Sequence, residues 1–218
     1  MLLVGITGSI GMGKSTVANM FKDHGFGVYN ADDTVHYIYE NDEEVISKIE
    51  AKFPGTINNG TVNRIALRDL LNKDPSQFKD LEAIVHPATR KYQQIYIKKL
   101  IEDKKFGCIL DIPLLFETGG EKYVDVSVVV TATAETQMDR VVTQRKIPLD
   151  VFKSIQGQQM PDHEKLKKAD YIISTECDIS DTEKEVRDVV SKIKIIQPKA
   201  WSKYLSLIHI SEPTRPSL

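Results

Sequence analysis

The chain has 218 residues, of which 41% are hydrophobic, and its 29 basic and 31 acidic side chains give a formal net charge of −2. This content can bury one sizeable core, so we expect a single domain with insertions or at most two small ones, without a global basic field for nucleic acids or membrane surfaces. Because the chain has only two cysteines and no apolar stretch of roughly 20 residues, we expect a cytoplasmic protein with reduced thiols, not a disulfide-linked, zinc-binding or membrane-spanning one.

The first predicted element is a short buried strand at residues 1–6, which leads into a glycine-rich segment at residues 8–15. That segment reads G-x-x-x-x-G-K-S, and Val17, Met20 and Phe21 follow it at helical spacing. A strand, a glycine loop and a helix in this order are the context of a phosphate loop. The sequence therefore predicts a nucleoside triphosphate site at its N-terminal end.

Glycines leave room for backbone amides to curl around a phosphate chain, and the helix that follows offers unpaired N–H groups. In this pattern Lys14 reaches the β and γ phosphates, and the Ser15 hydroxyl binds a Mg²⁺ ion that bridges them. The expected nucleotide contacts within the loop are Gly8, Gly11, Met12, Gly13, Lys14, Ser15 and Thr16.

A second strand is expected at residues 26–29, and Asp32 follows it closely. A carboxylate at this place could project over the phosphates and accept the proton of an attacking hydroxyl. Asp is also a favoured helix N-cap, so Asp32 could be structural instead, although Asp33 could cap the helix equally well.

The stretch from Asp33 to Leu100 is charged and helix-rich, and turn residues interrupt it at 53–55 and 58–60 without a convincing strand. We interpret it as a helical insertion that holds a second substrate. Within it, Pro87 is expected at the first position of a helix, which makes His86 the residue before it and sets Arg90 one turn along. These two side chains could grip a phosphate, or His86 could be purely structural.

Further strands are expected at residues 107–112, 124–130 and 171–173, separated by helical patterns. Such an alternation predicts an α/β fold with a parallel sheet, which binds ligands at the carboxyl ends of its strands. Asp111 ends the apolar part of the third strand, where P-loop proteins place a carboxylate that holds Mg²⁺. The alternative for Asp111 is a turn acid at a strand end.

A basic segment at residues 136–146 has the pattern of a lid over the phosphates. Gln137 and Arg140 share a helix face by their i, i+3 spacing, and Arg145 with Lys146 leads out of the helix towards Pro148. A lid arginine would neutralise charge on the transferring phosphoryl group. A solvated basic helix is the alternative interpretation.

Taken together, the motifs resemble those of the dephospho-coenzyme A kinase family from residue 2 to about residue 195. The phosphate loop names only a superfamily, whereas D-I-P-L-L-F-E and H-P-x-x-R are much more specific. The matching segments are G-K-S-T at the end of 8–16, N-A-D at 30–32, L-E-x-I-x-H-P-x-x-R at 81–90, D-I-P-L-L-F-E at 111–117, Q-x-x-R at 137–140, Q-M-P at 159–161 and A-D-Y at 169–171.

The resemblance implies ATP-dependent phosphorylation of the ribose 3′-hydroxyl of dephospho-coenzyme A, with Mg²⁺ held by Ser15 and Asp111. It implies a three-layer P-loop fold with a five-stranded parallel sheet, formed by residues 1–198, an acceptor-binding helical insertion at 33–100 and a lid at 137–165. The protein is expected to be a monomer or a weak homo-oligomer. Implied roles are Asp32 as base, Lys14 and Arg140 on the transferred group, Arg145 on ATP, and His86, Arg90, Leu114, Phe116 and Glu117 on the acceptor.

Two departures from the family pattern stand out. Asn30 replaces the first Asp of D-A-D, which we expect to be tolerated, and Ser174 with Thr175 replaces the usual Asp-Asn, which puts a contact on the adenine side in doubt. Residues 205–218 continue no family element and contain two prolines, so we interpret them as a non-native or disordered tail.

Two alternatives remain, one a different P-loop kinase and the other a nucleotide-dependent switch. A different nucleoside or nucleotide kinase would share the phosphate loop and lid but should lack D-I-P-L-L-F-E. A GTP-dependent switch should carry N-K-x-D and D-x-x-G motifs, and residues 72–75 read N-K-D-P, with proline where the motif needs aspartate.

Overall fold

The computed structural model describes residues 1–202, so the expectation for residues 205–218 lies outside the described residues. The chain divides into two compact units. The first contains Met1–Tyr29 and the described chain from Leu100 onward, and the second is Asn30–Lys99. Among residues 1–202, none of the helices has the length and apolar content needed to cross a membrane.

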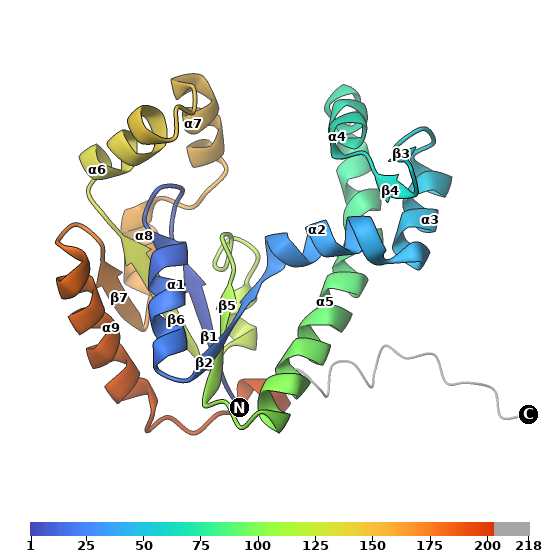
Figure 1. The fold of residues 1–218 in the computed structure, drawn as a ribbon. Helices are drawn as coiled ribbons and strands as arrows, with labels where there is room; N and C mark the ends of the chain where they lie inside the picture. The colour runs from blue at the N-terminus through green and yellow to red at the C-terminus, as the bar shows by residue number, and fades with distance from the viewer. Residues whose placement is uncertain (203–218) are drawn as a thin grey trace, which may run out of the picture. The chain divides into compact units, whose positions relative to one another are not determined.

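The first unit is built on a five-stranded parallel sheet with the strand order β2-β5-β1-β6-β7 (Figure 1). This confirms the predicted fold class. The strands are β1 (Leu2–Thr7), β2 (Phe26–Asn30), β5 (Gly107–Asp111), β6 (Val126–Thr131) and β7 (Tyr171–Ser174). The register pairs Ile6 of β1 with Asp111 of β5, so Asp111 lies beside the point where β1 leads into the phosphate loop.

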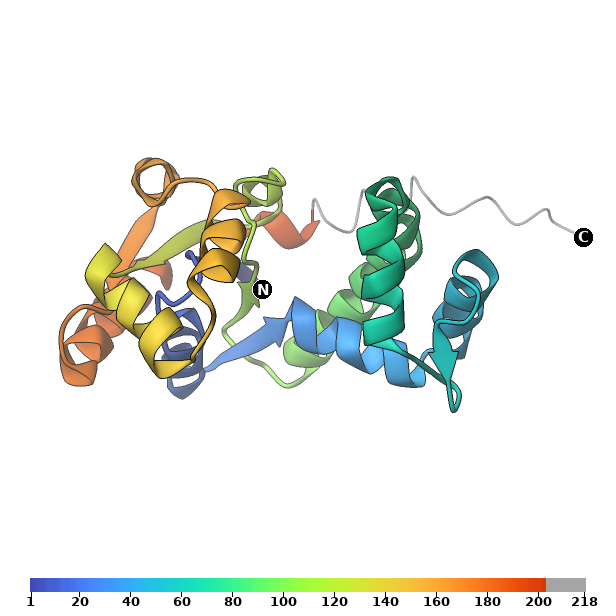
Figure 2. The same cartoon turned by 90° about the horizontal axis from the view of Figure 1, so that it is seen from above.

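Helices cover both faces of this sheet, which Figures 1 and 2 show from two sides. Along β6, Val128 and Val130 pack into the same core as Phe21 of α1 (Lys14–Asp23) and Val186 of α9 (Ile179–Ile193). Val129 between them packs on the other face with Leu115 and Phe116. Because successive strand side chains point to opposite faces, the continuous apolar run of β6 fits a strand buried on both sides.

On the second face and at the carboxyl end of the sheet the chain forms short helices. They are η2 (Gly120–Tyr123), α6 (Ala134–Met138), the π-helix η3 (Asp139–Gln144), α7 (Leu149–Gly157) and α8 (Asp162–Lys168). The basic segment 136–146 is therefore not one regular α-helix, since it changes to π-helical hydrogen bonding at Asp139.

The second unit has its own core, to which Ile38, Ile49, Phe53 and Leu67 contribute buried side chains. Its helices are α2 (Ala31–Asn41), α3 (Glu43–Lys52), α4 (Arg64–Lys73), the short η1 (Pro75–Gln77) and α5 (Phe78–Glu102), which continues into the first unit.

The expectation that residues 33–100 hold no strand is wrong, because β3 (Ile57–Asn58) and β4 (Thr61–Val62) form a small antiparallel hairpin. Its two-residue turn is Asn59-Gly60, and both residues have positive φ, 50° and 79°. Asn-Gly is the residue pair that such a turn favours, so the segment that we interpreted as an interruption is the turn of the hairpin.

Candidate active site

The phosphate loop connects β1 to α1, as its sequence predicts. A Cβ atom at Gly8 would collide with the carbonyl oxygen of Val130 in the neighbouring strand. Gly13, the residue before α1, has a left-handed conformation with φ of 83°. These two glycines are therefore required by the path of the loop, which delivers the unpaired N–H groups of the first turn of α1 to one place.

Lys14 forms an ion pair with Asp111, with 2.8 Å between Nζ and Oδ1. Only 17% of the lysine side chain and 7% of the aspartate side chain are exposed. A buried charge needs a partner, and this pair brings together the phosphate-loop lysine and the acid at the end of β5. Asp111 is thus part of the site and not an isolated turn acid.

Ser15 is the second residue of α1 and is exposed, while Asp111 is largely buried at the end of β5. A hydroxyl and a carboxylate are the hard oxygen donors that Mg²⁺ prefers. Residues 1–202 contain no group of three or more His, Cys, Asp or Glu side chains that could hold a metal.

A cavity of about 330 Å³ opens beside the loop. The residues that line it include Gly11, Gly13, Thr16, Arg140, Arg145, Thr175 and Cys177. The structure therefore brings both predicted arginines to the same cavity as the phosphate loop. Met12 differs from the other predicted loop contacts, because its side chain is buried and its Sδ accepts a hydrogen bond from the N–H of Ala132.

The side chains of Arg140 and Gln137 both contact the phosphate loop. They therefore do not belong to a basic helix face that is fully in solvent. The Arg140 guanidinium donates to the Thr175 carbonyl oxygen at 2.6 Å and to Thr175 Oγ1 at 2.8 Å. Gln137 is 2% exposed, and its Nε2 donates to the Ile10 carbonyl oxygen at 2.7 Å. Thr175, one of the two departures from the family pattern, also donates from Oγ1 to the Met12 carbonyl oxygen at 2.9 Å.

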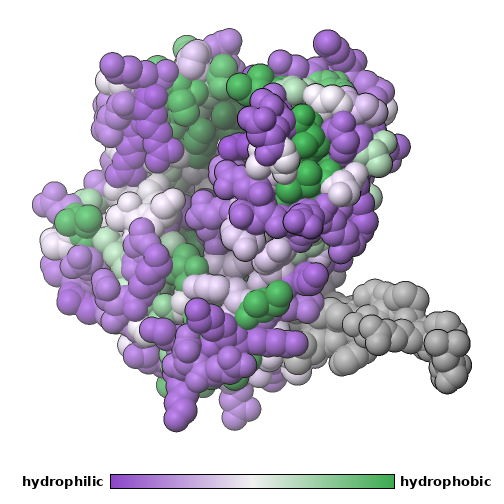
Figure 3. Space-filling view, turned by 45° about the vertical axis from the view of Figure 1, so that its right-hand side comes forward, coloured by the Kyte–Doolittle hydropathy of each residue, from purple (hydrophilic) through white to green (hydrophobic). Residues whose placement is uncertain are grey.

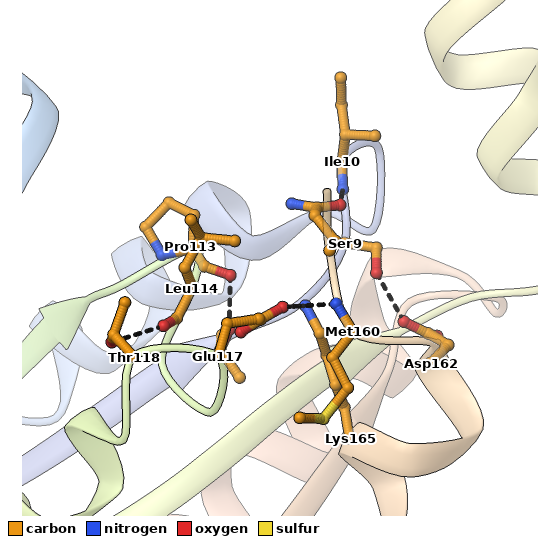
Figure 4. Close-up of polar contacts among 11 residues, drawn as sticks. Ser9, Ile10, Pro113, Leu114, Glu117, Thr118, Met160, Asp162 and Lys165 are labelled. Atoms are coloured by element: carbon orange, nitrogen blue, oxygen red, sulfur yellow. Dashed lines mark hydrogen bonds and ion pairs between the residues drawn. The ribbon is translucent and has the colours of Figure 1, made fainter. Parts of the chain in front are cut away.

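Two side chains to which the sequence motifs assign no role, Asp162 and Gln159, hold the other side of the loop, and Figure 4 shows Asp162 beside Ser9. Asp162 Oδ1 accepts from Ser9 Oγ at 2.8 Å, and Gln159 Oε1 accepts from the N–H of Ile10 at 3.1 Å. Gln159 belongs to the Q-M-P segment, which matches the family pattern but to which the sequence assigns no chemical role. Asp162 follows Pro161 at a helix start, where an acid is ordinary, so nothing in the local sequence marks it.

The three predicted acceptor contacts in the segment after β5 differ in their exposure and in the residues that they contact. Leu114 is 38% exposed, whereas Phe116 is 6% exposed and packs in the core beside Leu115. Glu117 Oε1 accepts from the N–H of Met160 at 2.7 Å and pairs with Lys165 Nζ at 3.1 Å. Leu114 is therefore the surface side chain of this segment, and Glu117 binds the chain that leads into α8.

Burial by itself raises the pKa of Glu117, but hydrogen bonds from the backbone N–H groups of Met160 and Glu117, together with the Lys165 ammonium, lower it below its ordinary value of 4.5. A carboxyl group whose pKa is depressed on folding stabilises the fold above its unfolded value. This contribution is lost as the pH falls through the folded-state pKa.

Asp32 lies in the first turn of α2, and its side chain is exposed. The cap of this helix is Asn30, whose Oδ1 accepts from the N–H groups of Asp32 at 2.9 Å and Asp33 at 3.2 Å. The suggestion that Asp32 or Asp33 caps the helix is therefore wrong. Asn30, which replaces a family carboxylate, has a structural role that an amide oxygen performs well.

His86 and Arg90 are exposed on α5. The prediction that Pro87 begins a helix, with His86 before it, is wrong because α5 runs without interruption from Phe78 to Glu102. A proline inside a helix removes one hydrogen bond, yet Val85 and Ala88 on either side pack into the core of the second unit. Packing thus keeps the helix continuous where local sequence predicts a boundary.

The parallel sheet, the glycine loop after β1 and the lysine–carboxylate pair define the chain as a P-loop kinase of the α/β class. The dephospho-CoA kinase family model matches residues 2–181. The dephospho-CoA kinase of Nitrobacter winogradskyi is 42% identical over 191 residues, which cover 88% of this chain and 95% of that protein. The dephospho-CoA kinase of Rhodopseudomonas palustris is 43% identical over 190 residues, or 87% of this chain and 94% of that one.

Solved structures agree with the sequence comparisons. A crystal structure from Thermus thermophilus has a TM-score of 0.77 at 32% identity and covers 88% of this chain and 97% of its own. The dephospho-CoA kinase from Campylobacter jejuni has a TM-score of 0.65 at 26% identity and covers 88% of this chain and 96% of its own. The chain belongs to the dephospho-CoA kinase family, and it is a kinase enzyme of coenzyme A synthesis.

Proposed function

We propose that this chain transfers the γ-phosphoryl group of ATP to the ribose 3′-hydroxyl of dephospho-coenzyme A, in the cytoplasm, and releases coenzyme A and ADP. The observation that carries the proposal is the Lys14–Asp111 pair at the phosphate loop of a chain that belongs to this family. The balance of charge and the two free cysteines support an ordinary cytoplasmic enzyme.

The nucleotide half of the reaction belongs to the first unit. The loop N–H groups bind the phosphates, and Lys14 moves its ammonium from the Asp111 carboxylate to the β and γ phosphate oxygens. Arg140 and Arg145 line the adjoining cavity and supply further positive charge. Arg140 stabilises the charge that develops on the transferring group.

Ser15 and Asp111 are the residues that would hold Mg²⁺. When bound, the ion neutralises phosphate charge and orients the γ-phosphoryl group. Asp111 loses the Lys14 ammonium when that side chain turns to the phosphates, so a cation is the natural replacement partner for its buried carboxylate.

The acceptor half of the reaction belongs mainly to residues 33–100. Asp32 accepts the proton of the ribose 3′-hydroxyl as its oxygen forms the new bond to the γ-phosphorus and the bond from that phosphorus to the ADP oxygen breaks. His86 and Arg90 bind anionic groups of the acceptor, and Leu114 contributes an exposed apolar contact. Residues 137–165 act as the lid.

The proposal is tested by coupled ADP release with Mg-ATP, run with and without dephospho-coenzyme A. We expect ADP release that depends on the acceptor, with coenzyme A as a product confirmed by mass spectrometry. Release of ADP without dependence on the acceptor, or an acceptor-dependent signal without coenzyme A in the products, contradicts the proposal.

A further inference from the structure

One side of the phosphate loop is held by a short segment, residues 159–162, which we name the bracket; Figure 4 shows Asp162 of this segment beside Ser9. At its C-terminal end, Asp162 uses both carboxylate oxygens. Oδ1 accepts from Ser9 Oγ in the loop, and Oδ2 accepts from Thr131 Oγ1 at the end of β6, each at 2.8 Å. At its other end, Gln159 accepts from the Ile10 N–H. The bracket thus ties two consecutive loop residues to the sheet.

The bracket itself rests on a buried ion pair. Lys165, one turn along α8 from Asp162, is fully buried, and the Glu117 carboxylate lies 3.1 Å from its Nζ. The same carboxylate binds the N–H of Met160 inside the bracket. Glu117 therefore fixes the bracket at its middle and at the helix that begins at Asp162.

The Asp162 carboxylate lies next to a loop that is expected to bind anionic phosphates. Asp162 is bonded to Ser9, whose neighbours bind phosphate groups that carry several negative charges, so its own charge opposes nucleotide binding. Its position is explained by geometry, because one planar group with two acceptor oxygens can bridge two hydroxyls on separate segments. The negative charge of Asp162 therefore weakens phosphate binding, while its two hydrogen bonds hold the loop in one conformation.

We propose that Asp162 is a positioning residue for nucleotide binding, which sets the shape of the phosphate loop through Ser9 and is itself held by the Glu117–Lys165 pair. The proposal rests on the proposed use of ATP but not on the identity of the acceptor. Asp162 bonds to Ser9 of the loop and to Thr131 of the sheet, so we expect its effect on nucleotide affinity to exceed its effect on the chemical step.

The test compares Asp162→Ala, Asp162→Asn and the control Asp170→Ala. Asp170 also accepts a hydrogen bond from a serine hydroxyl, Ser127 Oγ, at 2.7 Å, but it precedes β7 at the end of the sheet away from the loop. For each variant, the Kd of Mg-ATP is measured by calorimetry, KM and kcat by ADP release, and Tm by thermal unfolding.

We expect Asp162→Ala to weaken Mg-ATP binding by about tenfold, with a matching rise in the KM for ATP, since the loss of both hydrogen bonds to the carboxylate outweighs the removal of its negative charge. An amide can accept from Ser9 and donate to Thr131, so Asp162→Asn should stay within about threefold of the parent chain. Asp170→Ala should lower Tm and leave the Kd unchanged.

Two results overturn the proposal. One is a lower Tm for Asp162→Ala with an unchanged Kd, which would make Asp162 merely structural. The other is a raised KM for the acceptor with an unchanged Kd for Mg-ATP. Asp162, Ser9 and Gln159 also line a cavity of about 460 Å³, so that outcome would assign Asp162 to the acceptor itself. Because Mg-ATP binding is measured without acceptor, failure of the proposed reaction leaves this test readable.

Discussion

The phosphate loop and the exposed side chains of the second unit differ in how firmly the fold holds them. The loop is bonded by Gln137, Gln159, Asp162 and Thr175, all of them distant in sequence. Asp32, His86 and Arg90 instead stand exposed on the helices α2 and α5. The phosphate loop is thus organised by long-range contacts, whereas the side chains proposed to bind the acceptor lie on exposed helix surfaces.

Hydrophilic residues cover most of the face seen in Figure 3, with separate hydrophobic patches among them. Charged side chains that remain hydrated keep their rotamer freedom, so ordering them on a ligand costs conformational entropy. The loop residues have already lost that entropy on folding. Substitutions in the two regions should therefore have different kinetic signatures.

The largest effect is expected for Lys14→Ala. The lysine meets the phosphates in both the ground state and the transition state, so KM for ATP should rise and kcat should fall, with kcat/KM reduced by about 10³-fold. Steady-state kinetics measures this, and Lys22→Ala, on the exposed side of the same helix, is the control. Removal of the lysine also leaves Asp111 without its ammonium partner, so Tm is measured alongside.

Next in size is Asp32→Asn, which tests the residue of the second unit that is proposed as the general base. If Asp32 is the general base, kcat should fall by about 10²-fold while the Kd of Mg-ATP stays nearly constant. Asp33→Asn is a matched control, since both aspartates are exposed in the first turn of α2 and both N–H groups bind Asn30. An unchanged kcat for Asp32→Asn would remove Asp32 from the mechanism.

A smaller effect is expected for Arg90→Ala. Loss of one exposed guanidinium from the acceptor side should raise the KM for dephospho-coenzyme A about tenfold and leave the KM for ATP unchanged. His86→Ala should act in the same direction but more weakly, because an imidazole offers fewer hydrogen-bond donors to an anionic group than a guanidinium does. Lys98→Ala on the same helix is the control. If Arg90→Ala changes the KM for ATP and not the KM for dephospho-coenzyme A, the proposed division between nucleotide and acceptor residues is wrong.

The smallest effect is protection of a thiol. Cys177 is exposed and lines the cavity beside the loop, whereas burial raises the pKa of the Cys108 thiol to about 12. At pH 8 Cys108 therefore stays protonated and unreactive, and alkylation should modify Cys177 alone. Mg-ATP should slow that reaction several-fold relative to Mg²⁺ alone, as followed by mass spectrometry. Equal rates would place the nucleotide away from this cavity.

Local sequence predicted those parts of the site in which spacing along the chain fixes geometry. The glycine loop between a strand and a helix was found because its function depends on consecutive residues. Asp111 was found because it ends an apolar run, and the structure gives it Lys14 as a partner. The Asn59-Gly60 hairpin was also within reach of local reasoning, since both residues adopt the left-handed conformation that this pair favours.

Two errors show where local reasoning stops. Proline predicted a helix start at residue 87, but packing of the second-unit core carries α5 through it. An aspartate after a strand suggested a cap, but Asn30 performs that role two residues before Asp32. In both cases several weak local preferences were compatible with the sequence; core packing selected the continuous helix α5, and hydrogen bonds to the N–H groups of Asp32 and Asp33 made Asn30 the cap.

The sequence by itself determined the class of fold, the phosphate loop and the family, because each depends on residue types at short, fixed spacings. Only the tertiary structure decided which side chains hold that loop. Ser9 and Asp162 are separated by 153 positions, and their hydroxyl and carboxylate meet only because β1, β6 and α8 pack side by side. A hydrogen bond needs donor and acceptor within about 3 Å, and no pattern along the chain encodes that distance.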